Sequence, residues 1–202
     1  MRIDIILFDG FDELDALGPF EVFQNAALNG ADFIVRLVAP AGASEVVGAH
    51  GLRVKAEAAL RSKPSPELIL VPGGGWNDRR AQGARAETER GDIPAYLAEL
   101  HQSGVTIAAV CTGAMIVAAT GLLRGRPAIT HRGAIEDLRA AGAEIVQERV
   151  VDDGQLITAG GVTSGLDLAL WLVERYASKE IAGRVAGEME HERVGSVWRR
   201  EA

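Results

Sequence analysis

Hydrophobic residues along the chain fall into two alternating patterns. Short continuous apolar runs, such as residues 68–71, are typical of buried strands, and longer segments with apolar residues at helical spacing are typical of helices. Their alternation predicts an α/β fold, in which a doubly wound, mostly parallel sheet carries helices on both faces. We expect strands at residues 3–8, 33–38, 68–71, 107–110, 127–131, 144–151 and 155–158, and helices at 19–29, 92–102, 114–121, 134–141, 161–177 and 178–190.

Proline, glycine and aspartate positions set the limits of these elements. Pro19 suits the first position of a helix, which would stop at Asn29-Gly30. Asp152-Asp153-Gly154 has the residue types of a tight hairpin turn and predicts an antiparallel pair at an edge of the sheet. Residues 76–90 are expected to form a polar loop that is either a lid or simply solvated. The helix at 178–190 is expected to complete the chain.

Composition narrows the class of protein. A chain of 202 residues that is 48% hydrophobic suits one domain spanning 1–202. A single cysteine excludes an internal disulfide framework and fits a reducing compartment. No apolar stretch is long enough for a membrane span, and the N-terminus reads as a strand, so we expect a cytoplasmic protein. The formal net charge of −7 argues against nucleic acid or an anionic membrane as a partner.

The apolar run at 107–110 ends at the single cysteine, Cys111, and a helical pattern begins just beyond Gly113. This order predicts a strand, a tight turn and a helix, with Cys111 held at the turn as in a nucleophile elbow. A helix N-terminus beside the sulfur would favour the thiolate, so the pKa of Cys111 is expected to lie below the free value of about 8.5. The alternative is an inert buried cysteine that packs as a small hydrophobe.

Polar and glycine-rich segments follow several of the expected strands. In an open α/β sheet, functional groups gather at the carboxyl ends of the strands. This rule brings together the loop that carries Asp15, the glycines at 73–75, Cys111 and His131. His131 is either a polar wall or base of the site, or a structural histidine at a strand end.

Two common ligand-binding motifs are not satisfied. Residues 160–165 have the glycine spacing of a phosphate-binding loop, but Leu166-Asp167 stand where lysine and serine or threonine are required. The four histidines have no paired metal-ligand spacing, and one cysteine cannot build a thiolate cluster. We therefore expect no metal site.

Five segments of the chain together resemble the DJ-1/PfpI superfamily. Within it, Asp15 with Gly18-Pro19, and Cys111-Thr112-Gly113, are most similar to isonitrile hydratases and to the amidase-like domains of AraC-type regulators. The resemblance implies a flavodoxin-like sandwich, a homodimer and a reactive cysteine at the elbow. The segments that carry it are residues 14–23, 71–74, 110–114, 130–131 and 159–167.

The isonitrile hydratase pattern also implies roles for individual residues. Cys111 would be the nucleophile, Asp15 the acid and base, and Thr112 an auxiliary polar group. Backbone N–H groups near Gly74 and Thr112 would stabilise negative charge, and His131 would line the substrate pocket. Arg132 departs from the hydratase pattern, which commonly has tryptophan there.

The reaction that this resemblance implies is hydration of an isonitrile to an N-substituted formamide, without a metal or organic cofactor. Cys111 would attack the terminal carbon while Asp15 supplies a proton, and the resulting thioimidate would then be hydrolysed. Asp15 is therefore expected to have a raised pKa and to donate a hydrogen bond to the Cys111 sulfur. Three alternatives stay open: another cysteine-dependent activity such as glyoxalase or amidase, a ligand-sensing or oxidant-sensing domain, and an inert cysteine.

Overall fold

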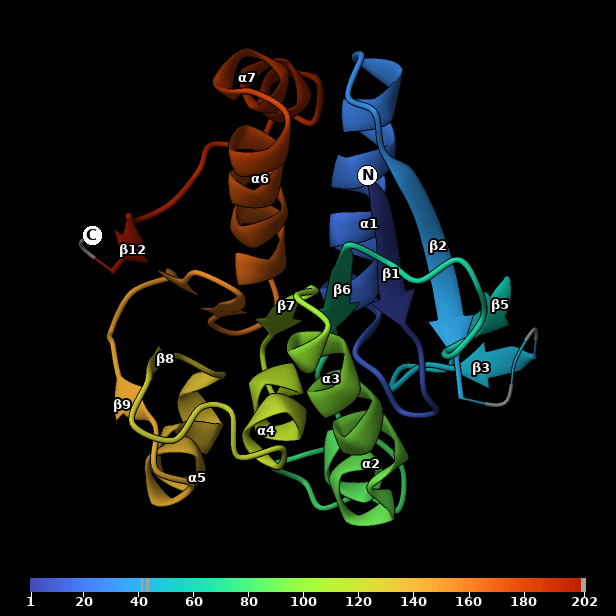
Figure 1. Cartoon of the computed structure of the whole chain (residues 1–202), viewed down its shortest axis with the longest axis vertical. Coiled ribbons are helices and arrows are strands. Elements are labelled where there is room, and N and C mark those ends of the chain that lie inside the picture. Colours follow the sequence, from blue (N-terminus) through green and yellow to red (C-terminus); the bar gives the residue numbers. More distant parts are fainter. Residues whose placement is uncertain (41, 43, 201–202) are drawn as a thin grey trace.

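A computed structural model of the chain describes residues 1–40, 42 and 44–200, so that four residues of the expected 1–202 domain lie outside the described part. Its main sheet has eight strands in the order β12-β10-β11-β7-β6-β1-β2-β5 (Figure 1). Neighbouring strands pair in parallel except for β10 with β11. The strands are β1 (Arg2–Ile6), β2 (Ile34–Ala39), β5 (Ala58–Ala59), β6 (Leu68–Val71), β7 (Thr106–Val110), β10 (Val150–Asp153), β11 (Leu156–Ala159) and β12 (Val197–Arg199).

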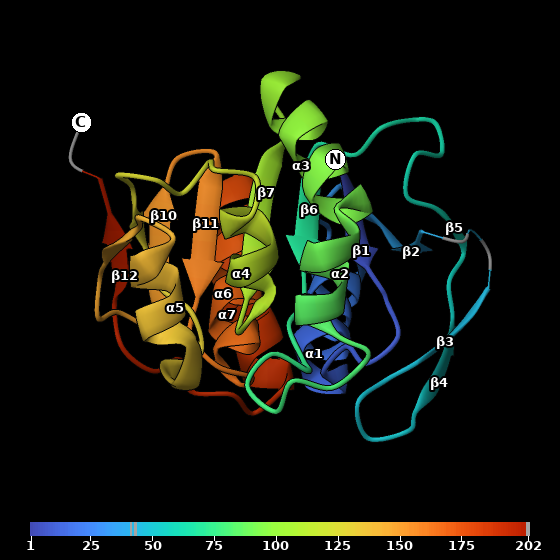
Figure 2. The same ribbon diagram turned by 90° about the horizontal axis from the view of Figure 1, so that it is seen from below.

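Helices cover both faces of this sheet (Figure 2). On one face α1 packs against α6 and α7, and on the other α2, α3 and α4 pack together, with α5 beside α4. This arrangement confirms the expected doubly wound, mostly parallel sheet. The helices are α1 (Glu13–Leu28), α2 (Ala84–Arg90), α3 (Asp92–Gln102), α4 (Gly113–Ala118), α5 (Ile135–Ala140), α6 (Ser164–Tyr176) and α7 (Lys179–Glu188).

The two central strands, β6 and β7, are buried along their whole length. Continuous apolar runs are what a parallel strand covered on both faces requires, so the sequence pattern identifies them directly. Because β1, β6 and β7 run in parallel, their carboxyl ends meet at one edge of the sheet. The segments that follow these three strands carry Asp15, Gly74, Cys111 and Thr112, whereas His131 follows β8 (Pro127–Ala128).

The first helix begins earlier than its proline predicts. α1 starts at Glu13, and its N-cap is Asp12, whose Oδ1 accepts the Leu14 N–H at 3.2 Å. The prediction that Pro19 opens the helix is therefore wrong, because Asp12 caps a helix whose first residue, Glu13, lies six positions earlier. Pro19 lies inside the helix, where its missing N–H removes the bond to the carbonyl of Asp15. Because the helix begins at Glu13, Asp15 lies within its first turn and is not the cap.

The structure has a helix, α2, where a loop was expected and a strand, β12, after the helix that was expected to be the last element. The predicted polar loop at 76–90 contains α2, which shows no apolar stripe because its two buried residues are Ala84 and Glu87. The chain does not finish with α7 either, since β12 follows it and pairs in parallel with β10. An edge strand of three residues is too short to produce a readable alternation.

The remaining strands form two small sheets. β3 (Glu45–Val47) pairs antiparallel with β4 (Arg53–Lys55), and β8 (Pro127–Ala128) pairs in parallel with β9 (Glu144–Ile145). The strand expected at 127–131 is therefore shorter and lies outside the main sheet. Within the described ranges, no helix is both long and apolar enough to cross a membrane.

Candidate active site

Cys111 lies at a sharp turn between β7 and α4. Its backbone has a φ of +56°, in the left-handed region that non-glycine residues rarely adopt. The Cys111 N–H donates to the carbonyl of Gly160 at 2.9 Å, and the Cys111 carbonyl accepts the Thr130 hydroxyl at 2.8 Å. These bonds hold a strained residue in place, which confirms the expected elbow geometry.

Gly113 allows the elbow to pack closely against the end of β6. A Cβ atom on Gly113 would overlap the carbonyl oxygen of Val71 and would lie 2.8 Å from that of Pro72. Both neighbours are backbone atoms that cannot rotate away. The turn that raises Cys111 therefore depends on glycine at this position.

Gly113→Ala should lower the free energy of unfolding by about 2 kcal/mol or more, because the new methyl group pushes the elbow away from β6. Urea denaturation measures the loss. Gly183→Ala in α7 is the matched control, since nothing lies within 4 Å of its Cβ position. That change should raise stability by up to about 1 kcal/mol. Equal effects of the two substitutions would contradict the packing argument.

Asp15 lies beneath the elbow and has no exposed surface. Its Oδ2 accepts the Gly73 N–H at 2.9 Å, whereas Oδ1 has no hydrogen-bond partner among the described residues. Burial, together with the nearby charge of Asp12, raises the pKa of Asp15 well above its usual range. The hydrogen bond from Gly73 and the side chain of Cys111 lower the pKa of Asp15, but by less than burial raises it. The predicted raised pKa is confirmed, and Asp15 is a buried acid.

Cys111 is 5% exposed. Burial, and then the Asp15 carboxylate, raise the pKa of Cys111 to about 12. Backbone N–H groups of Val162 and Thr112 reach the sulfur and favour its ionised form, but they do not offset burial. The prediction of a lowered pKa is wrong, because desolvation in a closed site outweighs the dipole of a six-residue helix.

Alkylation of Cys111 by iodoacetamide should be slower than that of a free thiol, and its rate should still be rising above about pH 8.5. The reason is that little thiolate is present until the pH approaches the raised pKa. The urea-unfolded protein is the control, because its cysteine should titrate near the free value. A rate that levels off below about pH 8.5 in the folded protein would contradict the burial argument.

Gly74 and Thr112 are joined by a hydrogen bond that was not foreseen. The Gly74 N–H donates to Thr112 Oγ1 at 2.9 Å, so this N–H does not face the sulfur. Gly74 has a φ of +115°, and a Cβ there would lie 2.5 Å from the Asp12 nitrogen. The donors that reach the sulfur are the N–H groups of Thr112 and Val162. Val162 has a φ of +36°, and its residue type gives no hint of this conformation.

His131 is half-buried beside the elbow. Its Nδ1 accepts the Gly133 N–H at 3.1 Å and lies 3.2 Å from the side-chain nitrogen of Asn77. With both donors at Nδ1, the ring proton belongs on Nε2. Gly161 packs against the other edge of the ring, where a Cβ would lie 2.5 Å from Cδ2. Asn77 is therefore a second residue of the site that the sequence pattern did not single out.

A cavity of about 230 Å³ lies over Cys111, and Gly74, Thr112 and His131 line it. Asp15 is below this cavity, against the backbone of Gly73. The structure thus brings the five expected residues to one place. The remaining residues that line the cavity are Asp12, Gly75, Trp76, Asn77, Asp78 and Val162.

Trp76 anchors the loop on one side of the cavity. Its Nε1 donates to Asp137 Oδ2 at 2.7 Å, and the guanidinium of Arg85 lies 4.2 Å from the ring centroid. Trp76 is 7% exposed, so it is part of the wall and not a solvated lid. In the ranges the structure describes, no group of three or more acidic, cysteine or histidine residues has the arrangement of a metal site.

Comparisons with known proteins agree with this fold. A model of the DJ-1/PfpI family matches residues 1–175. Isonitrile hydratase from Pseudomonas putida is 29% identical over 191 residues, which cover 95% of this chain and 78% of that protein. An uncharacterized protein from Staphylococcus aureus is 30% identical over 160 residues, or 78% of this chain and 88% of its own.

Solved structures show the same similarity. A THiJ/PfpI family protein from Pseudomonas syringae matches with a TM-score of 0.84 and 27% identity, over 95% of this chain and 75% of that one. DJ-1beta from Drosophila melanogaster has the same fold, with a TM-score of 0.82 and 22% identity over 95% and 98% of the two chains. The family model covers most of the chain, and the resemblance in its motifs is confirmed. The chain belongs to the DJ-1/PfpI family.

Proposed function

We propose that this protein is an isonitrile hydratase-like enzyme that adds water to an isonitrile and releases an N-substituted formamide. The observation that carries the proposal is a buried acid, Asp15, which interacts with the side chain of Cys111 and whose Oδ1 has no hydrogen-bond partner among the described residues. Similarity to an isonitrile hydratase along nearly the whole chain supports the same reaction.

An isonitrile can react with Asp15 and Cys111 while both side chains still carry their protons. Its terminal carbon is divalent, so it forms a bond to a nucleophile and a bond to a proton at the same atom. As the Cys111 sulfur attacks, Asp15 gives its proton to this carbon and takes the thiol proton. The S–H bond is exchanged for S–C and C–H bonds, and the product is a neutral thioimidate. No free thiolate is needed, which agrees with the raised pKa of Cys111.

Hydrolysis of the thioimidate uses the same carboxyl group. Asp15 takes a proton from water as the oxygen attacks the carbon, and it protonates the imine nitrogen. The tetrahedral adduct then collapses: the C–S bond breaks, the sulfur regains its proton, and the formamide leaves. The reaction consumes one water and leaves both side chains as they began.

The remaining residues of the site position this pair. The Thr112 hydroxyl holds the Gly74 loop, while N–H groups of Thr112 and Val162 support the sulfur as charge develops on it. His131 supplies a polar wall with its Nε2 proton. A cavity of about 230 Å³ limits the substrate to a small isonitrile with a compact substituent.

The direct test is to incubate the purified protein with a simple alkyl isonitrile and to follow the formamide by NMR. Methylglyoxal and a simple amide are tested in parallel, because glyoxalase or amidase activity is the main alternative. We expect formamide and no turnover of the other two compounds. Turnover of methylglyoxal alone would replace the proposal with a glyoxalase, and no turnover of any of them would favour a sensing role.

A further inference from the structure

A second cavity, of about 680 Å³, lies at the other end of the sheet from Cys111. The β10–β11 turn borders this cavity. The pairing of β11 with β7 shows at which end of β7 the turn lies. Ala159 of β11 pairs with Val110 beside Cys111, whereas Leu156, next to the turn, pairs with Ile107. The turn therefore points toward the amino end of β7. This cavity does not belong to the site described above.

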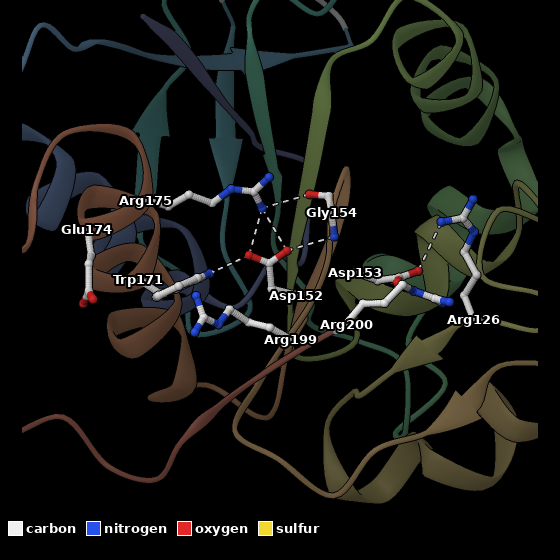
Figure 3. Close-up of a pocket in the computed structure, with 9 residues that line it drawn as sticks. All are labelled: Arg126, Asp152, Asp153, Gly154, Trp171, Glu174, Arg175, Arg199 and Arg200. Atoms are coloured by element: carbon white, nitrogen blue, oxygen red, sulfur yellow. Dashed lines mark hydrogen bonds and ion pairs between the residues drawn. The ribbon is translucent and has the colours of Figure 1, made fainter. Parts of the chain in front are cut away.

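Four arginines, three carboxylates and Trp171 line this second cavity (Figure 3). They come from separate parts of the chain: the β10–β11 turn, α6, the segment before β8, and the C-terminal strand β12. The chain as a whole has a net charge of −7, but in this cavity arginines outnumber acidic residues, so the lining carries a positive net charge. Such a group attracts anions.

The three carboxylates of the cavity already form hydrogen bonds or ion pairs within the protein. Asp152 accepts bonds from Arg175 Nη1 at 2.8 Å, from Trp171 Nε1 at 2.8 Å and from the Gly154 N–H at 2.9 Å. Asp153 pairs with Arg126 at 3.1 Å and with Arg200. Glu174 is held at 2.6 Å by an arginine outside the cavity lining. Little acceptor capacity is left for a further cation.

The arginines, in contrast, keep unused donors. Arg126 bonds through Nη1 and Arg200 through Nε, which leaves the other nitrogens of each guanidinium available. Arg199 makes no ion pair with a described residue, and its guanidinium lies 5.4 Å from the centroid of the Trp171 ring. Figure 3 shows the guanidinium of Arg199 beside Trp171 and below the carboxylate of Asp152. Among the residues that the structure describes, Arg126, Arg199 and Arg200 thus have guanidinium N–H donors without a protein acceptor.

We propose that this cavity binds a small anion with two or more negative charges, which presents phosphate or carboxylate oxygens. Guanidinium groups match the geometry of both oxyanions and bind them through paired, charge-assisted hydrogen bonds. Two of the arginines lie on β12 or next to it, so a bound anion would also link the C-terminal strand to β10 and α6. The proposal is independent of the isonitrile chemistry.

Calorimetric titration of the full chain with pyrophosphate and with citrate tests the proposal. Arg199→Gln should weaken binding by about tenfold or more, since one charged donor group is lost, and Arg199→Glu should abolish it. Arg53→Gln is the matched control, because Arg53 is an exposed arginine on β4 that pairs with Glu45. It should bind as the unaltered protein does, and Arg199→Gln should not change turnover at Cys111.

Binding of pyrophosphate alone would identify a phosphate ligand and binding of citrate alone a carboxylate ligand, and either result supports the site. Binding that is equally weakened by Arg53→Gln would show nonspecific attraction and overturn it. Absence of heat with both compounds at millimolar concentration would overturn it as well.

Discussion

Replacing Asp15 by asparagine is expected to lower kcat by about a hundredfold to ten-thousandfold, the usual cost of losing a general acid. Asparagine keeps the shape of the side chain and still accepts the Gly73 N–H, but it has no proton to give to the isonitrile carbon. The rate of formamide formation measures the loss. A variant that retains more than about a tenth of the rate would reject the proposed role of Asp15.

The same variant should be at least as stable as the unaltered protein above neutral pH. The pKa of Asp15 is raised in the folded state, so its contribution to stability is complete below the unfolded value of about 3.9 and is lost as the pH rises through the folded pKa. Asparagine does not ionise and avoids this loss. The difference in Tm between Asp15→Asn and the unaltered protein should therefore grow in favour of the variant as the pH rises.

Asp4→Asn provides a matched control with the opposite pattern. Asp4 is also fully buried, but it forms a salt bridge with Arg36 at 2.7 Å and lies outside the Cys111 cavity. Its replacement should lower Tm because the charge of Arg36 loses its partner, while kcat stays unchanged. A loss of stability without a loss of rate in Asp15→Asn would mean that Asp15 is structural too.

Cys111→Ser is expected to lower turnover by about four orders of magnitude or more, to near the uncatalysed rate. A serine hydroxyl fits the elbow and can accept the same N–H groups, yet it is a much poorer nucleophile toward carbon. Thermal denaturation should show a folded protein with nearly the same Tm. Substantial formamide production by this variant would remove Cys111 from the mechanism.

The sequence was sufficient to predict the central strands of the sheet and the end of the sheet at which the candidate site residues meet. Continuous apolar runs identified β6 and β7, and a cysteine followed by glycine at the end of β7 identified the elbow. The rule that functional groups gather at the carboxyl ends of parallel strands then placed Asp15, Gly74 and His131 near Cys111. Each of these inferences depends on local pattern and on parallel topology.

What could not be predicted depends on the tertiary environment. The pKa of Cys111 is set by desolvation, and burial of one side chain cannot be read from its neighbours in the chain. Asn77 and Val162 enter the site through loop conformation, which their residue types do not encode. The start of α1 was misplaced because Pro19 suggested a beginning, although Asp12 provides the better cap.

The most direct test of the Cys111 mechanism is peptide mass spectrometry of the protein quenched during turnover of an alkyl isonitrile. Addition of the thiol to the isonitrile loses no atoms, so the Cys111 peptide should be heavier by the whole mass of the isonitrile. This adduct should disappear once the substrate is consumed. Formamide that accumulates while Cys111 stays unmodified at every quench time would contradict covalent catalysis by this residue.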